Sequence, residues 1–91
     1  MGRIDLSEEN YSEAIQNFNM AIIAKPKDFE AYFLRGIAKF SLNDFNGAVS
    51  DFDKTLEIHP LYVRAYHYRG ISNDRLENYA DAKKDFERAI S

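Results

Sequence analysis

The most restrictive feature of this sequence is an internal repeat with a period of 34 residues. Identical residues recur at this step, namely Gly2, Gly36 and Gly70; Ala14, Ala48 and Ala82; Phe18, Phe52 and Phe86; and Pro26 and Pro60. Residues 29–57 and 63–91 are identical at nine of 29 aligned positions, whereas unrelated sequences of average composition would share about two. Such a period predicts a fold that stacks one small unit, and it directs the search for function toward surfaces.

Each unit is predicted to be a helical hairpin. Residues 31–42 contain no proline and few polar side chains, which predicts a first helix. Asp44 is a suitable N-cap for a second helix over about 45–58. Asn78 occupies the same position in the third unit and Asn10 in the first, so we expect each of them to begin a second helix as well.

The small residues of the repeat predict close helix packing. A glycine inside a helix costs about 1 kcal/mol relative to alanine. Three glycines in one phase of the repeat therefore indicate that a neighbouring helix approaches the backbone closely at each of them. The recurring alanines indicate the same on the second helix of each unit.

This pattern resembles the tetratricopeptide repeat, a 34-residue helix–turn–helix unit with an aromatic residue, Leu-Gly, a second aromatic, Ala, Phe, Ala and Pro in order. The matching residues are Tyr32, Gly36, Ala48, Phe52 and Pro60 in the second unit; Tyr66, Gly70, Ala82, Phe86 and Ala89 in the third; and Gly2, Ala14, Phe18, Ala21 and Pro26 in the first. The sequence departs from the pattern at Arg35 and Arg69, which replace the leucine, and at Thr55, which replaces the late alanine. Residues 5, 39 and 73 lack the second aromatic. The resemblance implies an all-α fold, an α-solenoid of about 2.6 tandem repeats in a right-handed superhelix.

The phase of the repeat divides residues 1–91, which we expect to form a single domain, into a partial unit (1–28), a complete unit (29–62) and a unit that lacks its end (63–91). We refer to these as units one, two and three. Terminal repeats normally carry a polar outer cap. The last helix keeps an apolar face, made of Ala82, Phe86, Ala89 and Ile90. We therefore expect either a fragment of a longer array or a second copy of the chain that covers these ends by dimerisation or by exchange of a helix.

Composition argues against several functional classes. The net charge of −3 disfavours a nucleic-acid interface, and the longest apolar run, residues 20–24, is too short to insert into a membrane. The sequence contains no cysteine, and neither His59 nor His67 has a second ligand at metal-binding spacing. Glycine-rich phosphate loops and nucleophile elbows are also missing. We predict no enzyme activity, cofactor or metal, and a protein or peptide as the partner.

The cellular compartment stays open. No signal peptide is visible, and the lack of cysteine favours a reducing, cytoplasmic environment, although many secreted proteins also lack cysteine.

One charge pattern recurs with the repeat. Arg35 and Asp51 are sixteen residues apart, as are Arg69 and Asp85, and each pair occupies the same two positions of its unit. In unit one both partners are missing together. We predict that each arginine pairs with its aspartate and ties together the two helices of a unit; the alternative is two unrelated surface charges.

The resemblance implies that the first helices of the units line a concave groove. The ligand-facing positions of the family are occupied by Glu30, Phe33, Ile37, Phe40 and Ser41 in unit two; by Arg64, His67, Ile71, Asp74 and Arg75 in unit three; and by Arg3, Leu6 and Ser7 in unit one. We predict a partner-binding face made of Phe33, Ile37, Phe40, Arg64, His67, Ile71 and Arg75. One alternative is that the apolar residues of unit two only pack inside the superhelix, and another is that the chain is a structural or self-associating segment without a ligand of its own.

The subgroup of the family that grips the acidic C-termini of heat-shock chaperones uses a lysine and an asparagine on the first helix of its first unit. The corresponding positions here are Phe33 and Ile37 in unit two and His67 and Ile71 in unit three. Because that clamp is missing from these two units, the expected ligand is an apolar or mixed peptide beside a basic rim of Arg64, His67 and Arg75.

Overall fold

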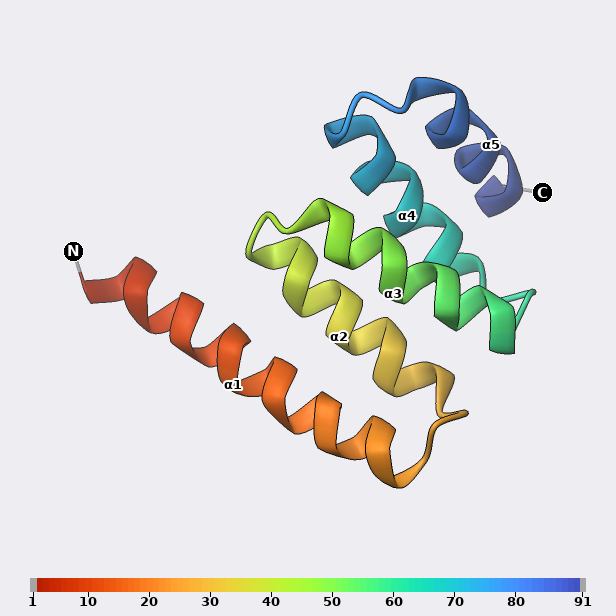
Figure 1. Cartoon of the computed structure of the whole chain (residues 1–91). Helices are drawn as coiled ribbons and strands as arrows, with labels where there is room; N and C mark the ends of the chain where they lie inside the picture. Colours follow the sequence, from red (N-terminus) through yellow and green to blue (C-terminus); the bar gives the residue numbers. More distant parts are fainter. Residues whose placement is uncertain (1, 91) are drawn as a thin grey trace.

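The computed structural model describes residues 2–90, and side chains from residue 9 onward. This part of the chain contains no strand and folds into α1 (Gly2–Ala24), α2 (Phe29–Ser41), α3 (Phe45–Ile58), α4 (Val63–Arg75) and α5 (Tyr79–Ile90). Each helix packs against the next in the chain, and α2 also touches α4. The helices form a single row of alternating direction (Figure 1). The prediction of an all-α solenoid is confirmed.

The N-caps explain where two of the helices begin. The Asp28 carboxylate accepts hydrogen bonds from the backbone N–H groups of Glu30 (3.1 Å) and Ala31 (3.4 Å) at the start of α2. The Asp44 carboxylate accepts one from Gly47 N–H (3.0 Å) at the start of α3. These bonds satisfy backbone donors that have no partner within the helix, and the predicted cap at Asp44 is confirmed.

The hairpins of units two and three close through the same tight turn. Asn43 (φ 66°) and Glu77 (φ 65°) adopt the left-handed conformation, which is costly for a residue with a side chain. The N–H of the next residue bonds to a carbonyl five residues earlier, Asp44 to Lys39 and Asn78 to Asn73, each at 2.8 Å. These bonds and the packing of the two helices offset the cost of the turn.

Unit one does not form this hairpin, so the prediction that Asn10 caps a second helix is wrong. Asn10 lies inside α1, which continues without a break from Gly2 to Ala24, and its N-terminal half extends past the end of α2 (Figure 1). Units two and three have Leu42 and Leu76 just before the left-handed residue, whereas unit one has Glu8. The sequence of unit one thus lacks the apolar residue that precedes the turn in the other two units, and the helix continues.

The core lies between α2, α3 and α4. Its buried members are Phe33, Ala48, Phe52, Leu56 and Ala65, with tyrosines of unit three packed against them. Phe52 is fully buried, because α2 covers it from its own unit and α4 from the next.

The glycines have the packing role that the sequence predicts. A Cβ on Gly36 would lie 2.7 Å from Cε1 of Phe52, and a Cβ on Gly70 would lie 2.7 Å from Cε1 of Phe86. Real contacts of this kind are not that short, so each phenylalanine ring occupies the space that a side chain would need. The same role for Gly2 lies outside the described side chains.

Candidate functional site

Phe33 is the one member of the predicted face that the structure buries completely. Its side chain is 1% exposed, and its ring lies 5.1 Å from that of Tyr62 and 5.7 Å from that of Phe52. Phe33 therefore belongs to the core, as the packing alternative expects, and it does not present an open surface to a partner.

The two arginines of the predicted face lie over aromatic rings of unit two. The guanidinium of Arg64 is 5.1 Å from the ring centroid of Phe33, and that of Arg75 is 5.9 Å from that of Phe45. Both arginine residues are exposed. Cation–π contacts of this length position the charged groups while they stay in water.

The other members of the predicted face lie on two helices. His67 and Ile71 lie on α4 between the two arginines, and Ile37 and Phe40 lie on α2. Ile37, Phe40 and Ile71 are half-buried, and His67 is exposed. The Phe40 ring packs 5.7 Å from that of Tyr68, and the His67 ring packs 5.3 Å from it. Tyr68 of α4 thus packs against Phe40 of α2. The sequence analysis missed this contact because no repeat signal marks position 68.

The spacing of the α4 residues places them on one side of that helix. Arg64, His67, Ile71 and Arg75 are separated by three, four and four residues, which brings all four onto one face. Two cations therefore stand at the ends of a row about 16 Å long, from a rise of about 1.5 Å per residue, with an imidazole and an isoleucine between them.

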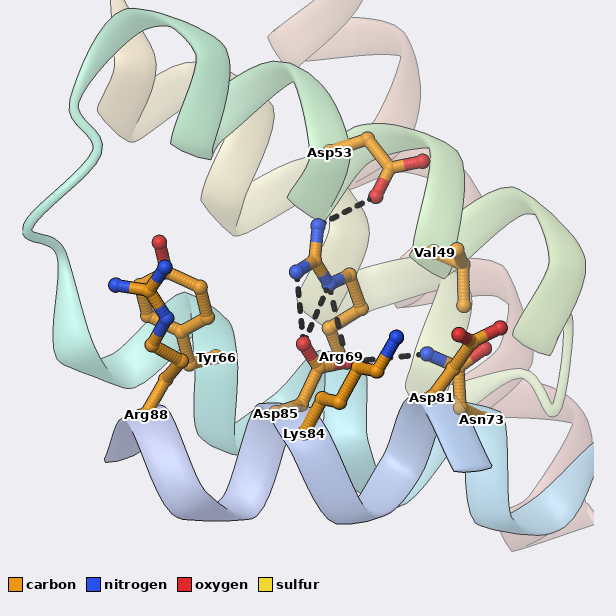
Figure 2. Close-up of a pocket in the computed structure, with 9 residues that line it drawn as sticks. All are labelled: Val49, Asp53, Tyr66, Arg69, Asn73, Asp81, Lys84, Asp85 and Arg88. Atoms are coloured by element: carbon orange, nitrogen blue, oxygen red, sulfur yellow. Dashed lines mark hydrogen bonds and ion pairs between the residues drawn. The ribbon is translucent and has the colours of Figure 1, made fainter. Parts of the chain in front are cut away.

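The second polar site of the molecule is a pocket of about 460 Å³ between α3, α4 and α5. Figure 2 shows its lining residues, which are Val49, Asp53, Tyr66, Arg69, Asn73, Asp81, Lys84, Asp85 and Arg88. Arg69 stands at its centre. Its Nη2 donates to Asp85 Oδ1 (2.7 Å) and its Nε to Asp85 Oδ2 (3.1 Å), while Nη1 donates to Asp53 Oδ1 (2.7 Å). The central cation is therefore held by carboxylates on two sides.

The equivalent arginine of unit two makes the same contacts. Arg35 donates from Nε (2.9 Å) and Nη2 (2.7 Å) to the two oxygens of Asp51, and from Nη1 to Asn19 Oδ1 (2.7 Å). We use the name arginine clasp for Arg35 with Asp51 and Asn19, and for Arg69 with Asp85 and Asp53. The predicted pairing of each arginine with its aspartate is confirmed. The third partner, which lies on the second helix of the preceding unit, was not predicted.

The clasps raise the pKa of both arginines. The hydrogen bond to Asp51 is the largest influence on the pKa of Arg35 and raises it above its ordinary value. For Arg69, partial burial is the largest influence and lowers the pKa, but the hydrogen bonds to Asp85 and Asp53 outweigh it, so the net shift is again upward. A raised pKa means that this stabilisation is present below the ordinary arginine pKa and is lost only as the pH rises past the raised value.

Among the side chains that the structure describes, no group of three or more histidine, aspartate and glutamate residues could hold a metal ion. None of the described helices is long and apolar enough to cross a membrane.

The five packed helices of residues 2–90 define a helical-repeat protein. Residues 1–63 and 33–91 both match the tetratricopeptide repeat, and together they span the sequence. The chain belongs to the tetratricopeptide repeat family. No curated protein shows significant similarity to it.

Several solved structures share the fold. The first tetratricopeptide repeat domain of Spaghetti (RPAP3), bound to the HSP90 peptide SRMEEVD, is 30% identical with a TM-score of 0.88, over 98% of this chain and 71% of that one. The TPR2B domain of yeast Sti1, in complex with pHsp70, is 26% identical with a TM-score of 0.85, over 97% and 70%. MamA is 26% identical with a TM-score of 0.86, over 89% of this chain, which spans 47% of the MamA chain.

Proposed function

We propose that this chain is a protein-interaction module that binds a short extended peptide along the exposed faces of α2 and α4. The observation that carries the proposal is the row on α4, in which the exposed Arg64, His67 and Arg75 accompany the half-buried Ile71. Half-buried Ile37 and Phe40 lie on the neighbouring α2. Cations around an accessible apolar strip favour a ligand that is both anionic and apolar.

The dimensions of the row define the ligand further. Arg64 and Arg75 are eleven residues apart, or about 16 Å along the helix axis. An extended peptide advances about 3.3 Å per residue, so about five residues separate two carboxylates that reach both arginines. We propose a ligand with acidic residues at this spacing and an apolar side chain between them.

Two of the similar structures support the general activity. Spaghetti is bound to an acidic HSP90 peptide, and the Sti1 domain is in complex with pHsp70. In this chain, however, the positions of the heat-shock clamp in units two and three hold Phe33, Ile37, His67 and Ile71. Since Phe33 is buried beneath Arg64, we propose that the arginines at the ends of the row provide the cationic contacts.

The test is fluorescence anisotropy with labelled heptapeptides in which the spacing of two acidic residues and the apolar centre are varied, with SRMEEVD included. We expect the tightest binding at a spacing of about five residues. Arg64→Ala and Arg75→Ala should each weaken binding by about tenfold, which corresponds to about 1.4 kcal/mol.

Lys83→Ala is the matched control, because it removes the same charge from an exposed position on α5 and should leave the affinity unchanged. If no peptide binds, or if Lys83→Ala weakens binding as much as the α4 variants, the proposed face is wrong.

A further inference from the structure

Within residues 2–90, no helix covers the face of α1 that carries the repeat signature in the way that first helices cover the equivalent faces of α3 and α5. Ala48 is 0% exposed and Ala82 is 3% exposed, because the first helix of each unit folds back over them. Ala14, at the same position of unit one, is half-buried, as are Phe18 and Ala21 beside it. Ala82 is buried although no described helix follows α5, so the helix that covers Ala48 and Ala82 but not Ala14 is the first helix of the same unit.

The residues that correspond to the first helix of unit one form the N-terminal half of α1. Because α1 is one continuous helix, they cannot fold back over its C-terminal half. Gly36 and Gly70 receive the rings of Phe52 and Phe86, each sixteen residues later. In unit one the corresponding pair is Gly2 and Phe18. Both lie on the continuous α1, so they are about 24 Å apart along its axis. Among the described helices, α1 contacts only α2.

We propose that two copies of this chain exchange the N-terminal halves of α1 and form a two-fold symmetric dimer. In the hairpins the first and second helices of a unit run antiparallel, and Gly36 meets Phe52. Two straight α1 helices placed antiparallel reproduce this contact twice, with Gly2 of each copy against Phe18 of the other. The symmetry axis then passes near Asn10, halfway between them, which is the position of the turn residues Asp44 and Asn78.

The polar residues of the sequence fit the same register. Lys39 contacts Asp51 (3.2 Å) in unit two, and the Asn73 amide donates to Asp85 (3.1 Å) in unit three. The corresponding residues of unit one are Asp5 and Asn17. The same two register positions therefore hold one acidic and one amide residue, with the acidic residue on the first helix in place of the second. Exchange of an identical element replaces contacts within one chain by the same contacts between two, so it needs no new interface.

The absence of native cysteine allows a direct test by disulfide formation. A Cβ on Gly36 would lie 3.2 Å from Cβ of Asp51, close to the range of about 3.5–4.5 Å in disulfides. The equivalent pair in unit one is Gly2 and Asn17. We expect the single variant Gly2→Cys, mixed with the single variant Asn17→Cys in a glutathione redox buffer, to give a disulfide-linked heterodimer. Ile23→Cys, at a residue that is 79% exposed and out of register, is the control and should link several-fold less.

Light scattering of the unmodified protein provides a second readout that does not depend on a substitution. The expected mass is twice the 10.6 kDa of the chain, and Phe18→Ala should lower the dimer fraction while Ile23→Ala leaves it unchanged. If the Gly2→Cys, Asn17→Cys double variant forms only an intramolecular disulfide, α1 folds back within one chain and the proposal is wrong. Linkage no greater than that of the control, with a monomeric mass at high concentration, would overturn it as well.

Discussion

The two complete hairpins, α2–α3 and α4–α5, build the same arginine clasp from oppositely charged surroundings. In unit two Asp51 receives two cations, Arg35 and Lys39, and the third partner of the arginine is neutral Asn19. In unit three Arg69 receives two carboxylates, Asp85 and Asp53, and the neighbour at the position of Lys39 is neutral Asn73. The two clasps therefore have the same geometry, but unit two has an extra cation and unit three an extra carboxylate. Equivalent substitutions in the two units should change the free energy of unfolding by different amounts.

The largest expected difference between the hairpins concerns their phenylalanines. Phe52 is fully buried between α2 and α4, whereas Phe86 is half-buried because no described helix follows α5. Phe52→Ala should lower the free energy of unfolding by about 3–5 kcal/mol, and Phe86→Ala by about half as much, measured by urea denaturation. Equal losses would mean that both rings are covered to the same extent in solution.

The next comparison removes the arginine of each clasp. Arg35→Ala leaves the buried Asp51 carboxylate beside the cation of Lys39, whereas Arg69→Ala leaves buried Asp85 with the neutral amide of Asn73. Because these pairs are partly exposed on the arginine side, the cost lies below that of a fully buried pair, at about 2–3 kcal/mol for Arg69 and about 1–2 kcal/mol for Arg35.

Thermal unfolding of both variants measures this difference. Lys39→Met is the control background, because Arg35→Ala introduced into it should become as costly as Arg69→Ala. A larger loss for Arg35→Ala than for Arg69→Ala in the native background would contradict the role of Lys39.

The smallest effect should come from exchanging the third partners. Asn19→Asp gives Arg35 a second carboxylate and should stabilise the protein by about 0.2–1 kcal/mol, while Asp53→Asn should destabilise it by a similar amount. Both effects should shrink in about 1 M salt, where exposed charges are screened over about 3 Å. Urea denaturation at low and high salt tests this. Changes of the same sign in the free energy of unfolding of the two variants would contradict the proposed role of the third partners.

Sequence analysis predicted the parts of the molecule that the repeat specifies. The period identified the hairpins of units two and three to within two residues at the helix ends. The sixteen-residue spacing identified Arg35 with Asp51 and Arg69 with Asp85, because both partners recur together. Two departures from the family pattern now have a physical reason. The arginines form the clasps, and Thr55 is buried with its hydroxyl donating to the Asp51 carbonyl (2.8 Å).

The errors arose where a contact depends on what lies beside a residue in space. Asn10 has the phase of a helix cap, but phase alone does not say whether the turn before it forms. For Phe33 the spacing allowed both a groove residue and a side chain that packs inside the superhelix, and spacing alone does not choose between them. Asn19 and Asp53 were missed as arginine partners because they belong to the preceding unit, and an analysis of pairs within a unit does not reach them.

The third partner of each clasp has a consequence for how the molecule unfolds. Since Arg69 of α4 bonds to α3 as well as to α5, unfolding of α4 and α5 together breaks a bond to the unit before them. Arg35 connects α1 to α2 and α3 in the same way. Successive units are thus coupled through their nearest neighbours, and hydrogen exchange of α3 amides should respond to the loss of a charge on α4. We therefore expect the two clasps to make the unfolding of the five described helices more cooperative.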